Sequence, residues 1–153
     1  MTPTIAIQQD DFDLALEIEA LTQGRPEAGA VVGFVGLCRD EGGRLSALEL
    51  EHYPGMAEEE VRRVVEEAGR RWPLLGATVI HRYGLVRPGD RIVLVATASS
   101  HRDAAFASAG FLMDWLKTRA PFWKREHLSD GTLGEWVAAK STDEDAAASW
   151  QQA

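Results

Sequence analysis

The sequence lacks the features that place a chain in a membrane or in an oxidising compartment. It has a single cysteine, Cys38, so no disulfide can form within the chain. No apolar run approaches the roughly 20 residues that a membrane-spanning helix requires. The first residues, MTPTIAIQQDDFD, have neither the basic start nor the apolar stretch of a signal peptide. We therefore expect a cytoplasmic protein that does not bind membranes.

The chain also lacks an excess of positive charge. Its 16 Lys and Arg residues stand against 24 Asp and Glu residues, which gives a formal net charge of −8. Binding to nucleic acid needs a basic surface that neutralises phosphates, so we expect no nucleic-acid partner. Residues 101–127 differ, because they contain five basic and three acidic side chains and leave 11 against 21 for the rest. A local basic stretch of this kind indicates a site for a small anion.

Length and composition are those of one soluble domain. A hydrophobic content of 45% and a charged content of 26% are ordinary for a globular protein. No internal repeat and no linker-like stretch divides the chain. We assign residues 1–140 to a single domain and residues 141–153 to a loosely attached C-terminal tail.

Apolar periodicity predicts a mixture of strands and helices. A short helix is expected before Gly24. The turn RPGD suggests that the strands on either side of it form a hairpin. Segment 29–37 is almost continuously apolar, as is typical of a strand buried on both faces. The predicted strands are 4–9, 29–37, 45–53, 77–84, 91–98, 122–127 and 134–139.

Two further segments have the pattern of long helices. In 57–72 an apolar stripe lies opposite four Glu-Arg pairs spaced i,i+4, and Pro73 ends the helix. The second helix starts at Ser100, which is predicted to form a capping box with Asp103, and it runs to Lys117. Together these segments predict several strands combined with two long helices. The apolar stripe of the second helix consists of Ala105, Phe106, Ala109, Leu112, Met113 and Leu116.

The stretch LKTRAPFWKREH, residues 116–127, holds the most informative group of side chains. Lys117 continues the apolar stripe of the second helix, and Lys124 follows a proline and two aromatic residues. Each lysine alone is typical of a solvated side chain whose stem packs on apolar neighbours. Two lysines held close together by a rigid apolar segment instead indicate an acid–base or nucleophilic site.

Three other cations are candidates for binding an anion. His101 and Arg102 begin the second helix, where free N–H groups favour anions, although exposed polar residues are equally typical of a helix start. Arg39 follows the apolar strand 29–37 and is either a ligand contact or an ordinary loop arginine.

The cysteine and two of the histidines are interpreted as structural. Cys38 ends a buried strand and has no CxxC partner, so it is treated as a small hydrophobe rather than a reactive thiol. His52 and His81 have no companions at metal-ligand spacing. We therefore expect no metal site and no bound cofactor.

Six segments, in this order, resemble those of a known family. They are GAVVGFVGLCRD, LELEHYPGM, RRWPL, VIHRYG followed by PGD, SSHRDAAF and LKTRAPFWKRE. On these segments the chain resembles the large, catalytic subunit of molybdopterin synthase over roughly residues 29–137. LKTRAPFWKRE is long enough to be the most specific of them.

That resemblance implies a fold, a reaction and partners. The implied fold is α+β, with hammerhead-like α/β subdomains, a mixed or antiparallel sheet and two long helices. The reaction converts cyclic pyranopterin monophosphate into molybdopterin by inserting two sulfurs as a dithiolene. Each sulfur arrives as a thiocarboxylate on the C-terminal glycine of a small ubiquitin-like subunit, whose Gly-Gly tail threads into the large subunit. The implied assembly is a heterotetramer built around a homodimer of large subunits.

The resemblance also implies site residues. Matched motif by motif, the family's essential lysines fall on Lys117 and Lys124. Leu37 and Cys38 replace a polar residue and a valine expected from the family, and the loop DEGG lacks the usual asparagine. The implied substrate-binding residues are Leu37, Cys38, Arg39, His101, Arg102, Lys117, Lys124, Arg125 and Glu126.

Two other functions are compatible with the residues taken alone. A non-catalytic phospho-ligand-binding or scaffold protein would use the same basic pocket and leave its ligand unchanged. A lysine-dependent Schiff-base enzyme would be trapped by borohydride in the presence of a carbonyl substrate.

The length of the second helix sets a further expectation. His101 and Lys117 are 16 residues apart, or about 24 Å in an unbroken helix. Both can contact one small pterin only if the helix breaks, for example at Gly110, or if a second copy of the chain completes the site. The predicted capping box and apolar stripe favour an intact helix, and therefore a site shared across a two-fold dimer.

Overall fold

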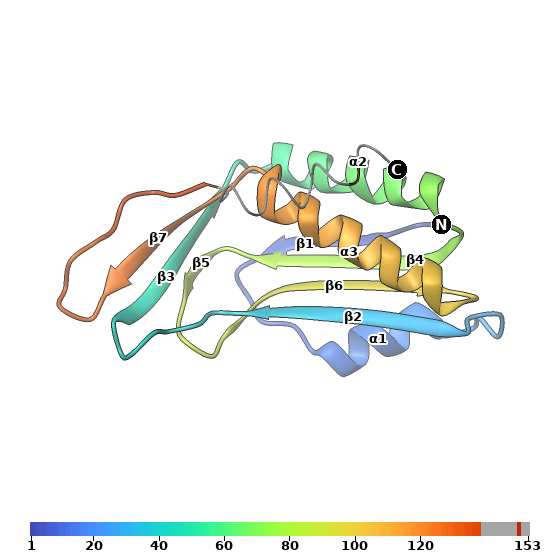
Figure 1. Ribbon diagram of the computed structural model, residues 1–153, viewed down its shortest axis with the longest axis horizontal. Coiled ribbons are helices and arrows are strands. Elements are labelled where there is room, and N and C mark those ends of the chain that lie inside the picture. The colour runs from blue at the N-terminus through green and yellow to red at the C-terminus, as the bar shows by residue number, and fades with distance from the viewer. Residues whose placement is uncertain (139–149, 151–153) are drawn as a thin grey trace.

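The computed structural model describes residues 1–138 and residue 150, and these contain three helices and seven strands. Figure 1 shows the long strands running along the length of the molecule between the helices. None of the helices within the described part is long and apolar enough to cross a membrane. In chain order the elements are β1 (Thr4–Gln8), α1 (Leu14–Thr22), β2 (Ala30–Leu37), β3 (Leu45–His52), α2 (Met56–Arg71), β4 (Leu74–Arg82), β5 (Gly84–Val86), β6 (Arg91–Ser99), α3 (Arg102–Thr118) and β7 (Phe122–Leu128).

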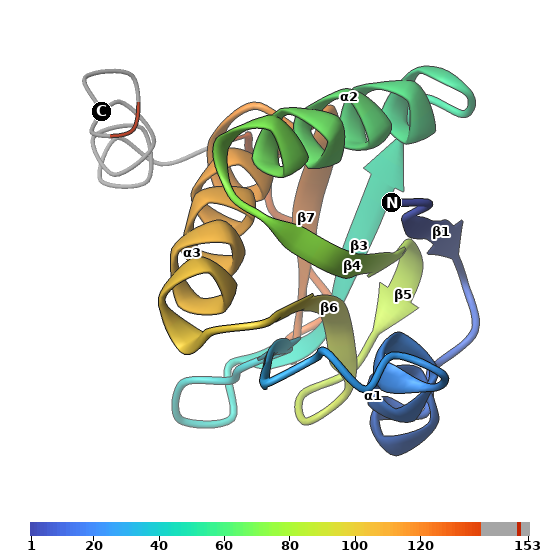
Figure 2. The ribbon, with the colours of Figure 1, turned by 90° about the vertical axis from the view of Figure 1, so that its right-hand side faces the viewer.

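The larger sheet has four strands in the order β1-β4-β6-β2. β1 is parallel to β4, and the other two pairings are antiparallel. Figure 2 shows α2 and α3 over one face of this sheet and α1 over the other. Because side chains alternate along a strand, Val79 and Val95 face the core beneath α2 and α3, whereas Ile80 and Leu94 face the core beside α1. The predicted α+β class with two long helices is confirmed.

A smaller sheet, in the order β5-β3-β7, extends from one end of the larger sheet (Figure 1, left). β3 and β7 pair in antiparallel fashion, with Leu50 opposite Lys124. β4 and β6 also pair as predicted, but they do not form a simple hairpin, because β5 lies between them in the chain and belongs to the smaller sheet. A small core at the junction of the two sheets consists of Cys38, Leu45, Leu50 and Val86.

β2 is an edge strand and none of its residues is fully buried, which corrects the prediction that it is buried on both faces. It pairs with β6 on one side, and no strand of the described residues pairs with its other side. Phe34 on this strand is 41% exposed and Leu37 is 57% exposed. An apolar run cannot by itself show whether neighbours cover both faces. These exposed apolar side chains are a surface suited to contact with another chain.

α3 is one continuous helix, and Gly110 does not interrupt it. Its N-cap residue is His101 rather than Ser100, and no side chain accepts a capping hydrogen bond there. The predicted capping box is therefore wrong. The helix is intact because its long buried face packs on β6 and β2, so tertiary packing replaces the missing cap.

Two details of side-chain placement on the long helices also differ from the predictions. Phe106, placed in the apolar stripe by its spacing, is 64% exposed, because the buried face includes Phe111 and Trp115 instead. Of the predicted i,i+4 ion pairs on α2, the one that forms joins Glu67 to Arg71. The other ion pairs found on this helix have i,i+3 spacing and join Glu60 to Arg63 and Glu67 to Arg70.

The segment after β7 runs back beside that strand without forming a strand of its own. The prediction of a strand at 134–139 is therefore wrong for the part described, and residue 139 lies outside the described residues. Trp150 packs edge-on against Trp72 and Phe111. The rest of the predicted tail, 141–153, lies outside the described residues. The two isolated bridges to β7 join Lys124 to Val137 and His127 to Leu133.

The same substitution at two glycines should change stability in opposite directions. A Cβ at Gly29 would lie 2.1 Å from the backbone oxygen of Ser100, so Gly29→Ala should lower the free energy of unfolding by about 1–3 kcal/mol. A Cβ at Gly110 would lie 3.6 Å from Trp150, an ordinary contact, and alanine is the better helix former. Gly110→Ala should therefore raise the free energy of unfolding by about 0.5–1 kcal/mol. Urea unfolding measures both, and a stabilised Gly29→Ala variant would contradict the packing described.

Candidate active site

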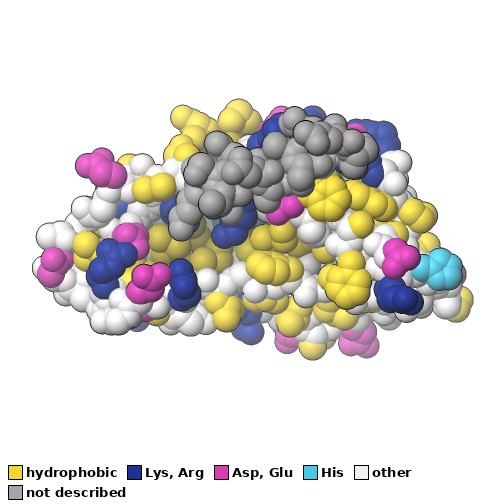
Figure 3. Space-filling model, in the orientation of Figure 1, with side chains coloured by type: hydrophobic (Ala, Val, Ile, Leu, Met, Phe, Trp, Pro, Cys, Tyr) yellow, Lys and Arg dark blue, Asp and Glu magenta, His cyan; other side chains and the backbone are white. Residues whose placement is uncertain are grey.

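A cavity of about 260 Å³ lies where the end of α3 meets the two sheets. Three ionisable side chains line it, His81, Lys117 and Lys124, and no carboxylate is among the described residues that do so. Figure 3 shows hydrophobic side chains along the middle of one face of the molecule, next to charged ones at the end formed by the smaller sheet. Apolar walls with a few cations suit a flat anionic ligand. The larger apolar side chains of the lining are Leu37, Leu48, Leu50, Ile92, Met113, Leu116, Phe122 and Trp123.

A reversal of the chain after α3 brings the two lysines to this cavity. Lys117 lies in the last turn of α3, which ends at Thr118, and Pro121 then leads directly into β7. Lys124 on β7 is opposite Leu50 on β3. Because Leu50 also lines the cavity, this face of the smaller sheet is turned toward it. The structure thus brings together the two lysines that the sequence singled out.

His81 is the third ionisable side chain of the cavity. Its ring stacks on Phe122, with ring centroids 3.9 Å apart and planes inclined by 11°. Its Nδ1 lies 2.8 Å from the carbonyl oxygen of Arg82. The pKa of His81 is lowered to about 4, chiefly because the ring is buried and then because of the charges of Lys117 and His52. The imidazole is therefore neutral at physiological pH.

Sequence reasoning missed His81, because it considered histidines only as metal ligands. The available signal was a polar ring within the apolar strand LLGATVIHR, where a histidine is either buried with a partner or turned toward a site. Among the described residues, no group of three or more His, Cys, Asp or Glu side chains could hold a metal ion.

Comparison with known proteins identifies the family. The chain matches the MoaE protein family over residues 7–119. It is 65% identical to the molybdopterin synthase catalytic subunit of Mesorhizobium japonicum, over 99% of this chain and 95% of that protein. The solved structure of the molybdopterin biosynthesis MoaE protein from Burkholderia ambifaria is 51% identical, with a TM-score of 0.84 over 98% of this chain and 99% of that one. The chain belongs to the MoaE family.

The family resemblance inferred from the sequence is thus confirmed, and with it the assignment to an enzyme subunit. A more distant solved structure, from the protein–protein complex of subunits 1 and 2 of molybdopterin-converting factor from Helicobacter pylori, shares the fold. Its TM-score is 0.71 at 20% identity, over 90% of each chain.

The site residues expected from the sequence at and after the end of β2 have different environments. Leu37 lines the cavity. Cys38 is buried, and its backbone N–H donates to the carbonyl oxygen of Asp90 at 2.8 Å. Burial and the nearby Asp90 and Asp40 carboxylates raise the pKa of the Cys38 thiol, as a structural role would require. Arg39 is exposed, and its Nη2 lies 2.9 Å from a carboxylate oxygen of Glu41.

Arg125 and Glu126 follow Lys124 but do not line the cavity. Arg125 alternates to the outer face of the smaller sheet, where it donates to Glu49 at 2.8 Å and lies 4.5 Å from the Trp136 ring. Glu126 forms an ion pair with Arg44 at 3.0 Å. The hydrogen bonds from Arg125 and His127 lower the pKa of Glu49. These residues support β7 around the second lysine.

His101 and Arg102 lie at the opposite end of α3 from the cavity. Both are exposed. With α3 unbroken, 16 residues separate His101 from Lys117, or about 24 Å. The structure therefore does not bring these two residues to Lys117 and Lys124 within one chain.

The free energy of unfolding should fall between pH 6.5 and pH 4 because of His81. The unfolded ring binds a proton near pH 6.5, whereas the folded ring binds one only near its pKa of about 4. The contribution of His81 to the free energy of unfolding is therefore fully present above pH 6.5. It falls by roughly 3 kcal/mol as the pH is lowered toward 4. Urea unfolding across this range should give a steeper loss for the wild type than for His81→Gln, which cannot titrate. Parallel curves would contradict the lowered pKa.

Proposed function

We propose that the chain is the catalytic subunit of a molybdopterin synthase acting in the cytoplasm. It converts cyclic pyranopterin monophosphate into molybdopterin, taking sulfur from the C-terminal thiocarboxylate of a small ubiquitin-like subunit. The observation that carries this proposal is the convergence of Lys117 and Lys124 on one apolar-walled cavity in a chain of the MoaE family. The name of the Mesorhizobium relative and the two-subunit Helicobacter complex support it.

The cavity has the properties that this reaction needs. The pterin is flat and can lie between aliphatic and aromatic walls, whereas the cyclic phosphate and the thiocarboxylate are anions that the lysines attract. Cations in a cavity with apolar walls stabilise developing negative charge more strongly than they do in water. A positioned ammonium group can also donate a proton during the transfer. Because the partner supplies the sulfur, the buried Cys38 has no chemical role to perform.

We also propose that the enzyme is a homodimer of this chain within a heterotetramer, with an active site shared between the two copies. The unbroken α3 keeps His101 and Arg102 away from the lysines of their own chain. In a two-fold dimer, the start of α3 in one copy can approach the cavity of the other. The apolar surface for such a contact is provided by Phe34 on β2 and Phe106 on α3, two elements that pack against each other. The substrate phosphate would then meet cations from both chains.

Removing either lysine's charge should abolish turnover without unfolding the chain. Lys117→Ala and Lys124→Ala should each lower kcat by about 10²–10⁴-fold, since both lysines line the cavity. Arg62→Ala, which removes an exposed cation on α2, is the matched control and should be near normal. The measurement mixes each variant with thiocarboxylated small subunit and cyclic pyranopterin monophosphate, and quantifies molybdopterin. Near-normal activity of Lys117→Ala would refute the assignment, and a binding protein would return the substrate unchanged.

Mixed dimers test the shared site. His101→Ala and Lys117→Ala homodimers should both be nearly inactive, because each site lacks one residue. A heterodimer of the two has one site with both mutations and one site with neither, so mixing should restore up to about half of the wild-type activity per heterodimer. Subunit exchange is verified with differently tagged chains. Heterodimers that remain inactive, or a fully active monomer, would show that the site is not shared.

A further inference from the structure

Among the described residues, two lysines line the cavity together with few side chains that can accept a hydrogen bond. Apart from the lysines, His81 is the only side-chain base among the described residues that line it. The hydroxyl of Thr118, also in the lining, donates to the carbonyl oxygen of Asp114 at 2.8 Å. Among the described side chains that line the cavity, His81 is therefore the acceptor best placed for the ammonium group of Lys117.

The hydrogen bond at Nδ1 fixes the tautomer of His81. The carbonyl oxygen of Arg82 can only accept, so Nδ1 must carry the proton of the neutral ring. Nε2 then has a free lone pair, and it takes part in none of the hydrogen bonds found within the described residues. Stacking on Phe122 fixes the plane of the ring. The result is an acceptor with one orientation.

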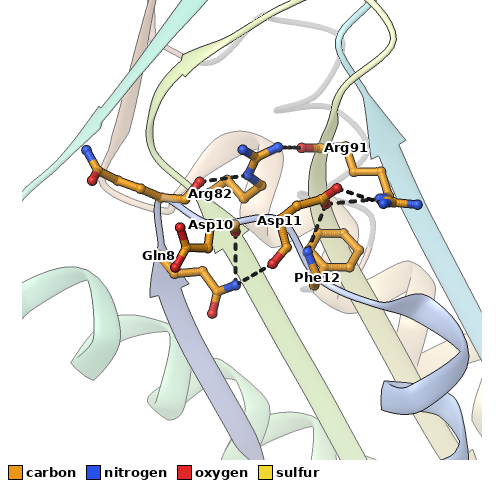
Figure 4. Close-up of polar contacts among 7 residues, drawn as sticks. Gln8, Asp10, Asp11, Phe12, Arg82 and Arg91 are labelled. Carbon is orange, nitrogen blue, oxygen red and sulfur yellow. Dashed lines mark hydrogen bonds and ion pairs between the residues drawn. The ribbon is translucent and has the colours of Figure 1, made fainter.

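The carbonyl that orients the ring belongs to a firmly anchored residue (Figure 4). The guanidinium group of Arg82 donates to the carbonyl oxygens of Gln9 at 3.0 Å and Arg91 at 2.9 Å, which ties the ends of three strands together. Arg91 in turn donates to Asp11 at 2.7 Å. This network holds the backbone at Arg82, and thereby Nδ1 of His81, in place.

We propose that His81 is a positioning residue for the sulfur transfer, whose Nε2 accepts a hydrogen bond from the ammonium group of Lys117 and holds it toward the substrate. This inference rests on the proposed function. A neutral imidazole supplies an acceptor to the cavity without adding a negative charge that would compete with the anionic ligands for the lysines. A carboxylate at the same place would also supply an acceptor, but it would add a negative charge that competes with the anionic ligands.

The surroundings of His81 favour the neutral ring that this role requires. Its neighbours in the larger sheet, Ile7 on β1 and Val93 on β6, are apolar. A proton on the ring would add a positive charge close to Lys117 and remove the acceptor at the same time. Acidification should therefore lower activity through His81. The titratable groups that face the ring from the other elements are Lys117 on α3, His52 on β3 and Lys124 on β7.

Two isosteric substitutions separate the functions of the two ring nitrogens. In His81→Gln the side-chain amide reaches the position of Nε2 and offers an acceptor there, but it loses the donor to Arg82. In His81→Asn the amide reaches the position of Nδ1 and keeps that donor, but it loses the acceptor. A positioning role predicts that His81→Asn lowers kcat by about 10- to 100-fold with little change in KM for the pterin, and that His81→Gln retains most activity. A structural role predicts the reverse order.

The assay uses the full chain with thiocarboxylated small subunit and cyclic pyranopterin monophosphate, from pH 3.5 to pH 9, so that it covers the pKa of about 4 of His81. The acidic limb of the wild-type kcat profile should be absent from both variants. Equal activity of His81→Asn and the wild type, or the reverse order of the two variants, would overturn the inference. If the wild type itself forms no molybdopterin, the proposed function is wrong and this inference falls with it. If the wild type is active and His81→Asn is equally active, the positioning role is wrong but the proposed function stands.

A spectroscopic test covers the case in which His81→Asn does not fold. Long-range proton–nitrogen NMR of the wild type should show His81 as the neutral Nδ1–H tautomer from pH 5 upward. The Nε2 shift should change in Lys117→Ala, because that variant removes the donor. An Nε2 shift that is the same in the wild type and Lys117→Ala would overturn the inference.

Discussion

The antiparallel pairing of β7 with β3 is the interaction on which the cavity depends. Its register places Lys124 opposite Leu50, on the face turned toward the end of α3. A slip by one residue would turn Lys124 outward and bring Arg125 into the cavity. On the outer face, Glu49 accepts hydrogen bonds from Arg125 and His127, both at 2.8 Å, so cross-strand pairs reinforce the correct register. The residues beside the second lysine thus hold the strand that carries it.

The cationic character of the cavity arises from where the acids are placed. The chain is acidic overall, yet two carboxylates of the smaller sheet are paired with arginines. Glu49 is held by Arg125 on the outer face, and Glu126 pairs with Arg44. Apolar walls then make any further charge costly, which explains why the histidine in the same cavity is neutral. Such a cavity suits anionic ligands that can approach its lysines.

Much of the fold could be predicted from the sequence, because periodicity reports on which side of an element is buried. Most of the strands, the two long helices and the reversal at Pro121 follow from local patterns, whereas β5 and the absence of a strand in the described residues after Leu133 do not. Other features depend on neighbours that are distant in the chain. An apolar run does not reveal that β2 lies at an edge, and Ser100 has the right spacing for a cap that packing makes unnecessary. For the same reason, His81 could not be linked to Lys117 before the strand and helix were placed together.

The length of α3 connects the cavity to the edge of the larger sheet. The helix runs the length of β6 without a break, so its first residues cannot fold back toward its last turn. Leu37, at the end of β2, both lines the cavity and is 57% exposed, which means that the wall of the cavity continues into the open edge of the sheet. In the proposed dimer, a second copy that covers this edge would also close the cavity and supply His101 and Arg102. One surface would thus bury the apolar side chains and complete the site, so dimerisation and ligand binding would be coupled.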